Sequence, residues 1–239
     1  MFRLLFLLLA GLKFGKLFIT GGTMLLSVLL YAYVFGWPYA VGLVAMLFVH
    51  EMGHYIAARY KGLDAGLPMF IPFFGSWVQM KKMPHDAQTE AFVGLGGPLL
   101  GTVGALVCYF LARNYDAPWL LAVAYSGFLI NLINMIPISP LDGGRITAVL
   151  SPRIWLLGVP MLIGLFFYWP SPMLIIIAIM AAPQVMTAIR YRSDSLEGQT
   201  YYAVPSAVKW EYGCYYLVLA GFLAVMVHDV NEMLGPHRV

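Results

Sequence analysis

The stretch that decides the fold is Tyr39-Ala-Val-Gly-Leu-Val-Ala-Met-Leu-Phe-Val-His50-Glu51-Met-Gly-His54, in which an uncharged run leads into two imidazoles and a carboxylate. Titratable side chains at such a depth cost several kcal/mol unless a partner compensates them. On a helix, His50 and His54 lie four residues apart and therefore point from the same face. Two neutral imidazoles at this spacing can bind one Zn²⁺, and Glu51 beside them can act on a water molecule at the metal. The stretch thus predicts a membrane helix that carries half of a metal site.

The composition assigns the whole chain to the same class. Of its 239 residues, 61% are apolar and 10% are charged, and the mean hydropathy is +0.80. Soluble domains usually carry about 25% charged residues, so we expect a polytopic protein whose surroundings are the lipid bilayer. The net charge of +3 is small, and the absence of a basic run interleaved with aromatics excludes nucleic acid as an expected partner. Cys108 and Cys214 fall in apolar segments and indicate no disulfide framework.

The apolar segments predict an all-α polytopic membrane protein with six to seven transmembrane helices. A span needs about 20 mostly apolar residues. Seven segments qualify or nearly qualify: 17–36, 38–59, 91–112, 118–141, 154–169, 171–189 and 212–230. The fifth and sixth are short and separated by Trp169-Pro-Ser-Pro172, so residues 154–189 can form one span or two.

The placement of lysine and arginine predicts the orientation. With the N-terminus in the cytoplasm and seven crossings, the outer side keeps two cationic residues, Arg113 and Arg238. The inner side collects twelve: Arg3, Lys13, Lys16, Arg59, Lys61, Lys81, Lys82, Arg145, Arg153, Arg190, Arg192 and Lys209. This split follows the positive-inside rule and favours a cytoplasmic N-terminus in a prokaryotic cell membrane. His50 then lies about 13 Å before Arg59 along the helix, within the membrane near its cytoplasmic side.

Four segments follow from this topology. We expect a cytoplasmic or interfacial N-terminal segment over 1–16, a core over 17–190, a cytoplasmic loop over 191–211 and an accessory C-terminal helix over 212–239. Between the second and third spans, residues 67–80 alternate partly in polarity and are bounded by turn residues. They predict a short hairpin or a re-entrant loop. An exposed strand edge there can hold an extended substrate; the alternative is a connector that dips into the membrane.

Asp142 is the candidate for the third protein ligand that a catalytic zinc site needs beside its open position. It lies in Asn134-Met-Ile-Pro137-Ile-Ser-Pro140-Leu-Asp142-Gly-Gly-Arg145, where two prolines break the helix. Irregular backbone at membrane depth is tolerated around a cavity or within protein, and the two glycines allow a tight turn. Because the fourth segment ends on the inner side, Asp142 matches His50 and His54 in depth and sidedness.

Together these motifs resemble the site-2 protease family of intramembrane zinc metalloproteases. The resemblance covers about residues 38–150 and rests on His50-Glu51-x-x-His54, on Asn134-x-x-Pro137-x-x-Pro140-Leu-Asp142-Gly-Gly, and on the glycine-proline segment at 94–98. It implies that His50, His54 and Asp142 bind one Zn²⁺ per chain, that Glu51 is the catalytic base and that Asn134 polarises the scissile carbonyl. One departure is Gly101, where many relatives have asparagine; it affects local packing more than chemistry.

The function predicted from the resemblance is hydrolysis of a peptide bond in or near the transmembrane segment of a membrane-anchored protein. The alternative is a non-proteolytic metal-binding membrane protein, a scaffold or a permeation pathway, and the intact Glu51 argues against it. Oligomeric state and substrate identity stay open at this point, and we expect no organic cofactor.

Other polar residues have plainer interpretations. Asn131, one turn before Asn134, is expected to donate a hydrogen bond between helices. His85 and Asp86 are expected to be solvated loop residues. The segments Gly97-Pro98 and 101–104 are expected to allow close helix packing, with a position along the substrate path as the alternative. His228, Asp229 and Glu232 are interpreted as an interfacial cap, with a second metal site as the alternative.

Overall fold

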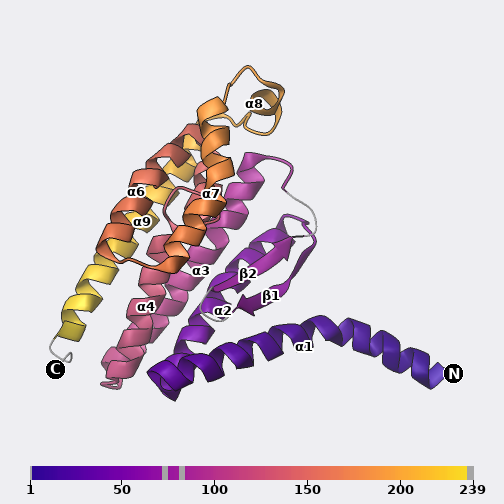
Figure 1. Ribbon diagram of the computed structural model, residues 1–239, viewed down its shortest axis with the longest axis vertical. Coiled ribbons are helices and arrows are strands. Elements are labelled where there is room, and N and C mark those ends of the chain that lie inside the picture. The colour runs from indigo at the N-terminus through magenta and orange to yellow at the C-terminus, as the bar shows by residue number, and fades with distance from the viewer. Residues whose placement is uncertain (1, 72–74, 81–83, 236–239) are drawn as a thin grey trace.

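The computed structural model describes residues 2–71, 75–80 and 84–235, with side chains described for residues 19–71, 76 and 84–235. Lys81, Lys82 and Arg238 of the charge pattern, and the side chains of the N-terminal segment, lie outside these residues. The described chain is helical apart from one hairpin, as predicted (Figure 1). Its elements are α1 (Phe2–Phe35), α2 (Trp37–Tyr60), β1 (Ala65–Ile71), β2 (Gly75–Met80), α3 (Ala87–Asn114), α4 (Pro118–Asn134), α5 (Asp142–Thr147), the 3₁₀ helix η1 (Pro152–Leu157), α6 (Gly158–Tyr168), α7 (Pro172–Arg190), α8 (Leu196–Thr200) and α9 (Ser206–Leu234).

Four of the described helices, α2, α3, α7 and α9, are long and apolar enough to cross a membrane. Two further apolar segments, Pro118–Asn134 and Pro152–Tyr168, are shorter. Ile19–Phe35 is the part of the 34-residue helix α1 whose side chains are described, and it is also apolar. The count of six to seven spans therefore stays a prediction. The segment Pro152–Tyr168 divides into η1 and α6, and the eleven residues of α6 reach about 16 Å, so α6 alone is shorter than the hydrocarbon core.

Helices α2 and α3 pack against each other at the centre of the fold. Glycines at their interface allow the two helix backbones to approach closely. A Cβ added at Gly53 of α2 would lie 2.1 Å from the carbonyl oxygen of Gly96 on α3, so the two backbones nearly touch. Small residues allow this approach in membrane helices, where lipid gives little hydrophobic driving force. In Figure 1, α2, α3, α4 and α9 run side by side, while α1 extends away at an angle.

The predicted hairpin is present and is antiparallel. Pro68 pairs with Val78 and Phe70 pairs with Ser76 across the two strands. The hairpin packs against α1 and α2. Buried Phe70 of β1 lies in a cluster with Tyr31 of α1 and Val44 of α2. The Phe70 amide also donates a hydrogen bond to the Thr23 hydroxyl of α1 at 3.3 Å. Ser76 on β2 is thereby held next to α2.

Helix boundaries correct three predictions. The fourth predicted segment, 118–141, was too long: α4 ends at Asn134, because residues before proline disfavour the helical conformation and Pro137 and Pro140 follow. Asp86 is not a plain loop residue but the N-cap of α3, with its side chain accepting from the Thr89 amide at 2.7 Å. The third helix consequently begins at Ala87 and not at 91.

The irregular stretch after α4 is held in place by neighbouring side chains. The Tyr216 hydroxyl of α9 donates to the Met135 carbonyl oxygen at 2.5 Å, and Gln184 of α7 accepts from the Ser139 amide. The Trp155 indole of η1 donates to the Gly144 carbonyl at 2.8 Å. The break in the helix leaves backbone groups without their helical hydrogen bonds, and these side chains pair with them. Such pairing is needed because unpaired backbone groups are costly in apolar surroundings.

Gly143 and Gly144, which were predicted to allow a tight turn after Asp142, lie in the first turn of α5 and allow close approach to the preceding chain. A Cβ at Gly143 would lie 2.2 Å from the Met135 carbonyl oxygen, and one at Gly144 would lie 2.4 Å from the Ser139 nitrogen. Only glycine lets the first turn of α5 pack on residues 135–139. Asp142 is the first residue of this turn, and the packing of the turn fixes the position of its backbone.

Candidate metal centre

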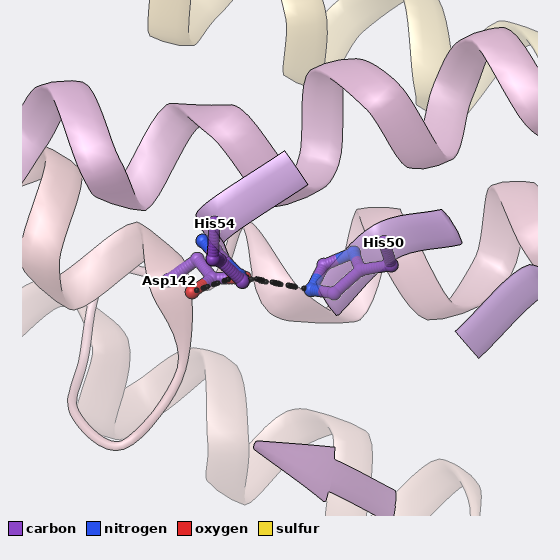
Figure 2. Close-up of side chains that lie close together, drawn as sticks. All are labelled: His50, His54 and Asp142. Carbon is purple, nitrogen blue, oxygen red and sulfur yellow. Dashed lines mark hydrogen bonds and ion pairs between the residues drawn. The ribbon is translucent and has the colours of Figure 1, made fainter. Parts of the chain in front are cut away.

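Helices α2 and α5 bring together the three predicted ligands. His50 and His54 come from successive turns of α2, and Asp142 comes from the first turn of α5 (Figure 2). His50 Nε2 lies 3.1 Å from one Asp142 carboxylate oxygen, and His54 Nε2 lies 3.1 Å from the other. The two Nε2 atoms are 3.2 Å apart. Among the described residues, these three form the group of potential metal ligands, and His228, Asp229 and Glu232 do not form a second one.

The donor set fits a tetrahedral divalent ion. Ligands at about 2.0–2.1 Å from one tetrahedral zinc ion are separated from each other by roughly 3.4 Å. The three separations in the cluster, 3.1, 3.1 and 3.2 Å, are within a few tenths of this value. Two imidazoles and one carboxylate leave a fourth position free for water or substrate, which is the composition of a catalytic and not of a structural site.

The site is deeply buried, and its polar atoms are paired. His50, His54 and Glu51 are each 5% exposed, and Asp142 is 6% exposed. Burying so many titratable groups is unfavourable unless they are paired or coordinate a metal. Every described buried side-chain nitrogen or oxygen has a hydrogen-bond partner. The second ring nitrogen of each histidine is bonded too: His50 Nδ1 to Asn131 Oδ1 and His54 Nδ1 to the Val93 carbonyl oxygen, both at 2.8 Å.

Glu51 and Asn134 line the same cavity as the three ligands. The cavity has a volume of about 700 Å³ and is mostly apolar, with walls from α1, α2, the hairpin, α3, α4, α5 and α7. Glu51 Oε1 accepts from the Ser76 hydroxyl of β2 at 3.0 Å. The Asn134 amide nitrogen donates to the Ile130 carbonyl at 3.0 Å, and its second N–H can donate to a bound group.

Sequence reasoning missed three contacts of this site. Asn131 does bridge helices, as predicted, but as an acceptor from His50 and not as a donor between helices. Ser76 carries no motif that predicts its contact with Glu51. Arg145 lines the cavity with a guanidinium nitrogen 3.9 Å from the Asp142 carboxylate, and its place three residues after Asp142 on a helix is the signal that indicates this proximity. Gly97 is a close-packing position as expected, directly against His54.

The chain is similar in sequence to known zinc metalloproteases over part of its length. Residues 38–116, which contain all but the first residue of α2 and do not include Asp142, match the model of peptidase family M50. The chain is 29% identical over 121 residues to zinc metalloprotease MJ0392 of Methanocaldococcus jannaschii, covering 46% of this chain and 35% of that protein. It is 33% identical over 89 residues to the probable chloroplastic zinc metalloprotease EGY1 of Arabidopsis thaliana, covering 34% of this chain and 16% of the relative.

A solved site-2 protease from Methanocaldococcus jannaschii aligns at 21% identity and a TM-score of 0.43, covering 70% of this chain and 85% of that one. The chain spans about a third or less of the length of the curated relatives named above. The resemblance to the site-2 protease family that the motifs indicate is confirmed. The protein is an integral membrane protein.

Proposed function

We propose that the protein is an intramembrane zinc endopeptidase. The observation that carries this proposal is the convergence of His50, His54 and Asp142 around one point, with Glu51 lining the same buried cavity. Of the two named curated relatives, MJ0392 is described as a zinc metalloprotease and EGY1 as a probable zinc metalloprotease. A zinc ion held by the three ligands would supply Lewis acidity, activating water near neutral pH and polarising the carbonyl under attack.

The remaining steps belong to side chains. Glu51 takes a proton from the attacking water and delivers it to the leaving amine, as a general base and then a general acid. The bond from Ser76 orients the Glu51 carboxylate. Asn134 donates its second amide N–H to the oxyanion as the tetrahedral carbon forms. The apolar walls of the cavity keep bulk water away and strengthen these electrostatic interactions.

The substrate we propose is a membrane-anchored protein whose transmembrane helix is locally unwound. A peptide bond inside a helix has its carbonyl bonded to the amide four residues on, so attack requires an extended segment. The hairpin lies beside Glu51, and a free strand edge can hold such a segment by main-chain hydrogen bonds. We further propose that the site opens toward the cytoplasm of a prokaryotic cell, with the N-terminus on the same side.

We also propose that residues 17–190 form the catalytic core, with 1–16, the loop 191–211 and the helix 212–239 as accessory parts. The alternative function is a scaffold or permeation pathway that only binds metal. It does not explain the carboxylate of Glu51, since metal binding does not require a base at that position.

A reporter experiment separates the two functions. The purified protein and a single-span membrane reporter are placed in the same liposomes, and cleavage is followed for wild type, Glu51→Gln and the matched control Glu211→Gln on the exposed face of α9. Wild type and the control should cleave, whereas Glu51→Gln should retain zinc and lose about 10²–10⁴ in rate. Cleavage by Glu51→Gln at the wild-type rate would place the base elsewhere and overturn the mechanism.

A further inference from the structure

Asn131 of α4 has an amide whose orientation is fixed by its two partners. Its side chain is 1% exposed. The amide nitrogen lies 2.7 Å from the Gly127 carbonyl oxygen, and the amide oxygen lies 2.8 Å from His50 Nδ1. A carbonyl only accepts, so the nitrogen must face Gly127 and the oxygen must face His50. His50 therefore donates from Nδ1, and its Nε2 lone pair faces Asp142 and His54.

His54 has the same arrangement with a different kind of partner. Its Nδ1 lies 2.8 Å from the Val93 backbone carbonyl of α3, which again only accepts. Both imidazoles are thus held in the tautomer that presents Nε2 to the cluster. The partner of His54 is backbone, and no substitution removes it directly. The partner of His50 is one side chain, so the orientation of His50 depends on that side chain.

The space for the Asn131 amide comes from a glycine on a third helix. A Cβ added at Gly101 of α3 would lie 2.4 Å from Asn131 Oδ1, 2.7 Å from Nδ2 and 2.9 Å from Cγ. All three contacts are with the amide group itself. The missing side chain at Gly101 therefore creates the volume that this amide fills, between α3 and His50 of α2.

The distance to Oδ1 also fits an amide supplied from α3. Within an asparagine side chain, Oδ1 lies about 2.4 Å from its own Cβ, from standard bond lengths. This equals the distance from a Cβ added at Gly101 to the present Oδ1 of Asn131. An asparagine at 101 can therefore place its oxygen where His50 now finds one, provided that position 131 is small.

We propose that Asn131 is a positioning residue for the metal site, that it acts by holding His50 in the tautomer with Nε2 free, and that Gly101 and Asn131 form one unit in which one amide, from either helix, performs this task. The inference rests on the proposed metal site. Residues that hydrogen-bond a metal-binding histidine fix its tautomer and orientation, and their loss typically costs about 10- to 100-fold in metal affinity.

The test measures zinc affinity by chelator competition on the purified protein for Asn131→Ala, Gly101→Asn and the double variant Gly101→Asn/Asn131→Ala. Each single variant should bind zinc about 10- to 100-fold more weakly, the first for lack of an amide and the second because two amides compete for one volume. The double variant should regain most of the lost affinity. Gly221→Asn on α9, where an added Cβ meets nothing within 4 Å, is the matched control and should bind zinc as wild type does.

Two further readouts separate positioning from general stability. Nitrogen-15 spectra of histidine-labelled protein should show an Nδ1-protonated His50 in wild type and in the double variant. Thermal unfolding identifies any variant that has lost its fold. Wild-type zinc affinity in Asn131→Ala would overturn the proposal, and so would a folded double variant no better than the two singles. If wild type itself bound no zinc, the proposed function would fail instead.

Discussion

Gly97 is the position where one added methyl group reaches the proposed metal site directly. It lies on α3, and a Cβ there would be 2.2 Å from His54 Nε2 and 2.5 Å from Cε1. Real Cβ atoms essentially never approach closer than 3.0 Å, so in Gly97→Ala the imidazole must move by about 0.8 Å. Helix α3 cannot yield easily, because the Gly96 carbonyl already touches Gly53 of α2.

A displacement of about 0.8 Å is too large for a metal ligand, because ligand distances are held to about ±0.2 Å. Gly97→Ala should therefore lose the His54 contribution and bind zinc at least about tenfold more weakly, the lower end of the effect of disturbing a ligand's surroundings. The assay is chelator competition in detergent, with thermal unfolding measured beside it. The control is Gly221→Ala on α9, where an added Cβ meets nothing within 4 Å.

A double variant makes this prediction specific. If the methyl group acts through the imidazole, His54→Ala removes the clash, and Gly97→Ala should add no further loss of zinc affinity in that background. Wild-type affinity in Gly97→Ala would refute the reasoning. A double variant far weaker than His54→Ala would show that the methyl group damages the fold by another route.

Three further outcomes follow from the same geometry. Purified protein should contain about one equivalent of zinc by metal analysis, and His54→Ala should lose most of it, since one of three protein ligands is gone; stoichiometric metal in a His50→Ala/His54→Ala variant would contradict the assignment. Asn134→Ala should retain zinc while kcat falls by about 10²–10³, the cost of a lost oxyanion donor, and an unchanged kcat would remove Asn134 from the mechanism. Ser76→Ala should slow cleavage about 10- to 100-fold without loss of zinc, because a hydrogen bond to a carboxylate contributes about 1.5–3 kcal/mol, and Ser76→Thr should restore the rate; equal rates in Ser76→Ala and wild type would show that Glu51 needs no such support.

The three proposed metal ligands could be predicted from the sequence because their positions follow from patterns within short segments of the chain. The four-residue spacing of His50 and His54 gives one helix face, and the prolines around Asp142 predict the broken helix that carries it. Titratable side chains are costly to bury in a membrane and are therefore rare there. Few acidic residues are consequently candidates for the third ligand. The hairpin was predictable for a similar reason, since its turn residues interrupt an apolar run.

The supporting contacts could not be predicted because they join segments far apart in the chain. Asn131 and His50 are separated by 81 residues, and Ser76 and Glu51 by 25. Their meeting depends on how closely α2, α3 and α4 pack, and the glycines that set this closeness, Gly53 and Gly101, carry no side chain that a periodicity argument can use. The role of Gly101 becomes clear only from the structure, where the Asn131 amide occupies the space that a side chain at position 101 would fill.

We propose that this chain cleaves peptide bonds with a zinc ion held by His50, His54 and Asp142. Removing and restoring the metal tests this proposal most directly. Purified protein in liposomes with a single-span reporter is stripped with a chelator and then given zinc again. Cleavage should stop when the metal is removed and return with about one equivalent of zinc per chain in wild type, but not in Asp142→Ala. Undiminished cleavage by metal-free protein, or full restoration in Asp142→Ala, would contradict the proposal.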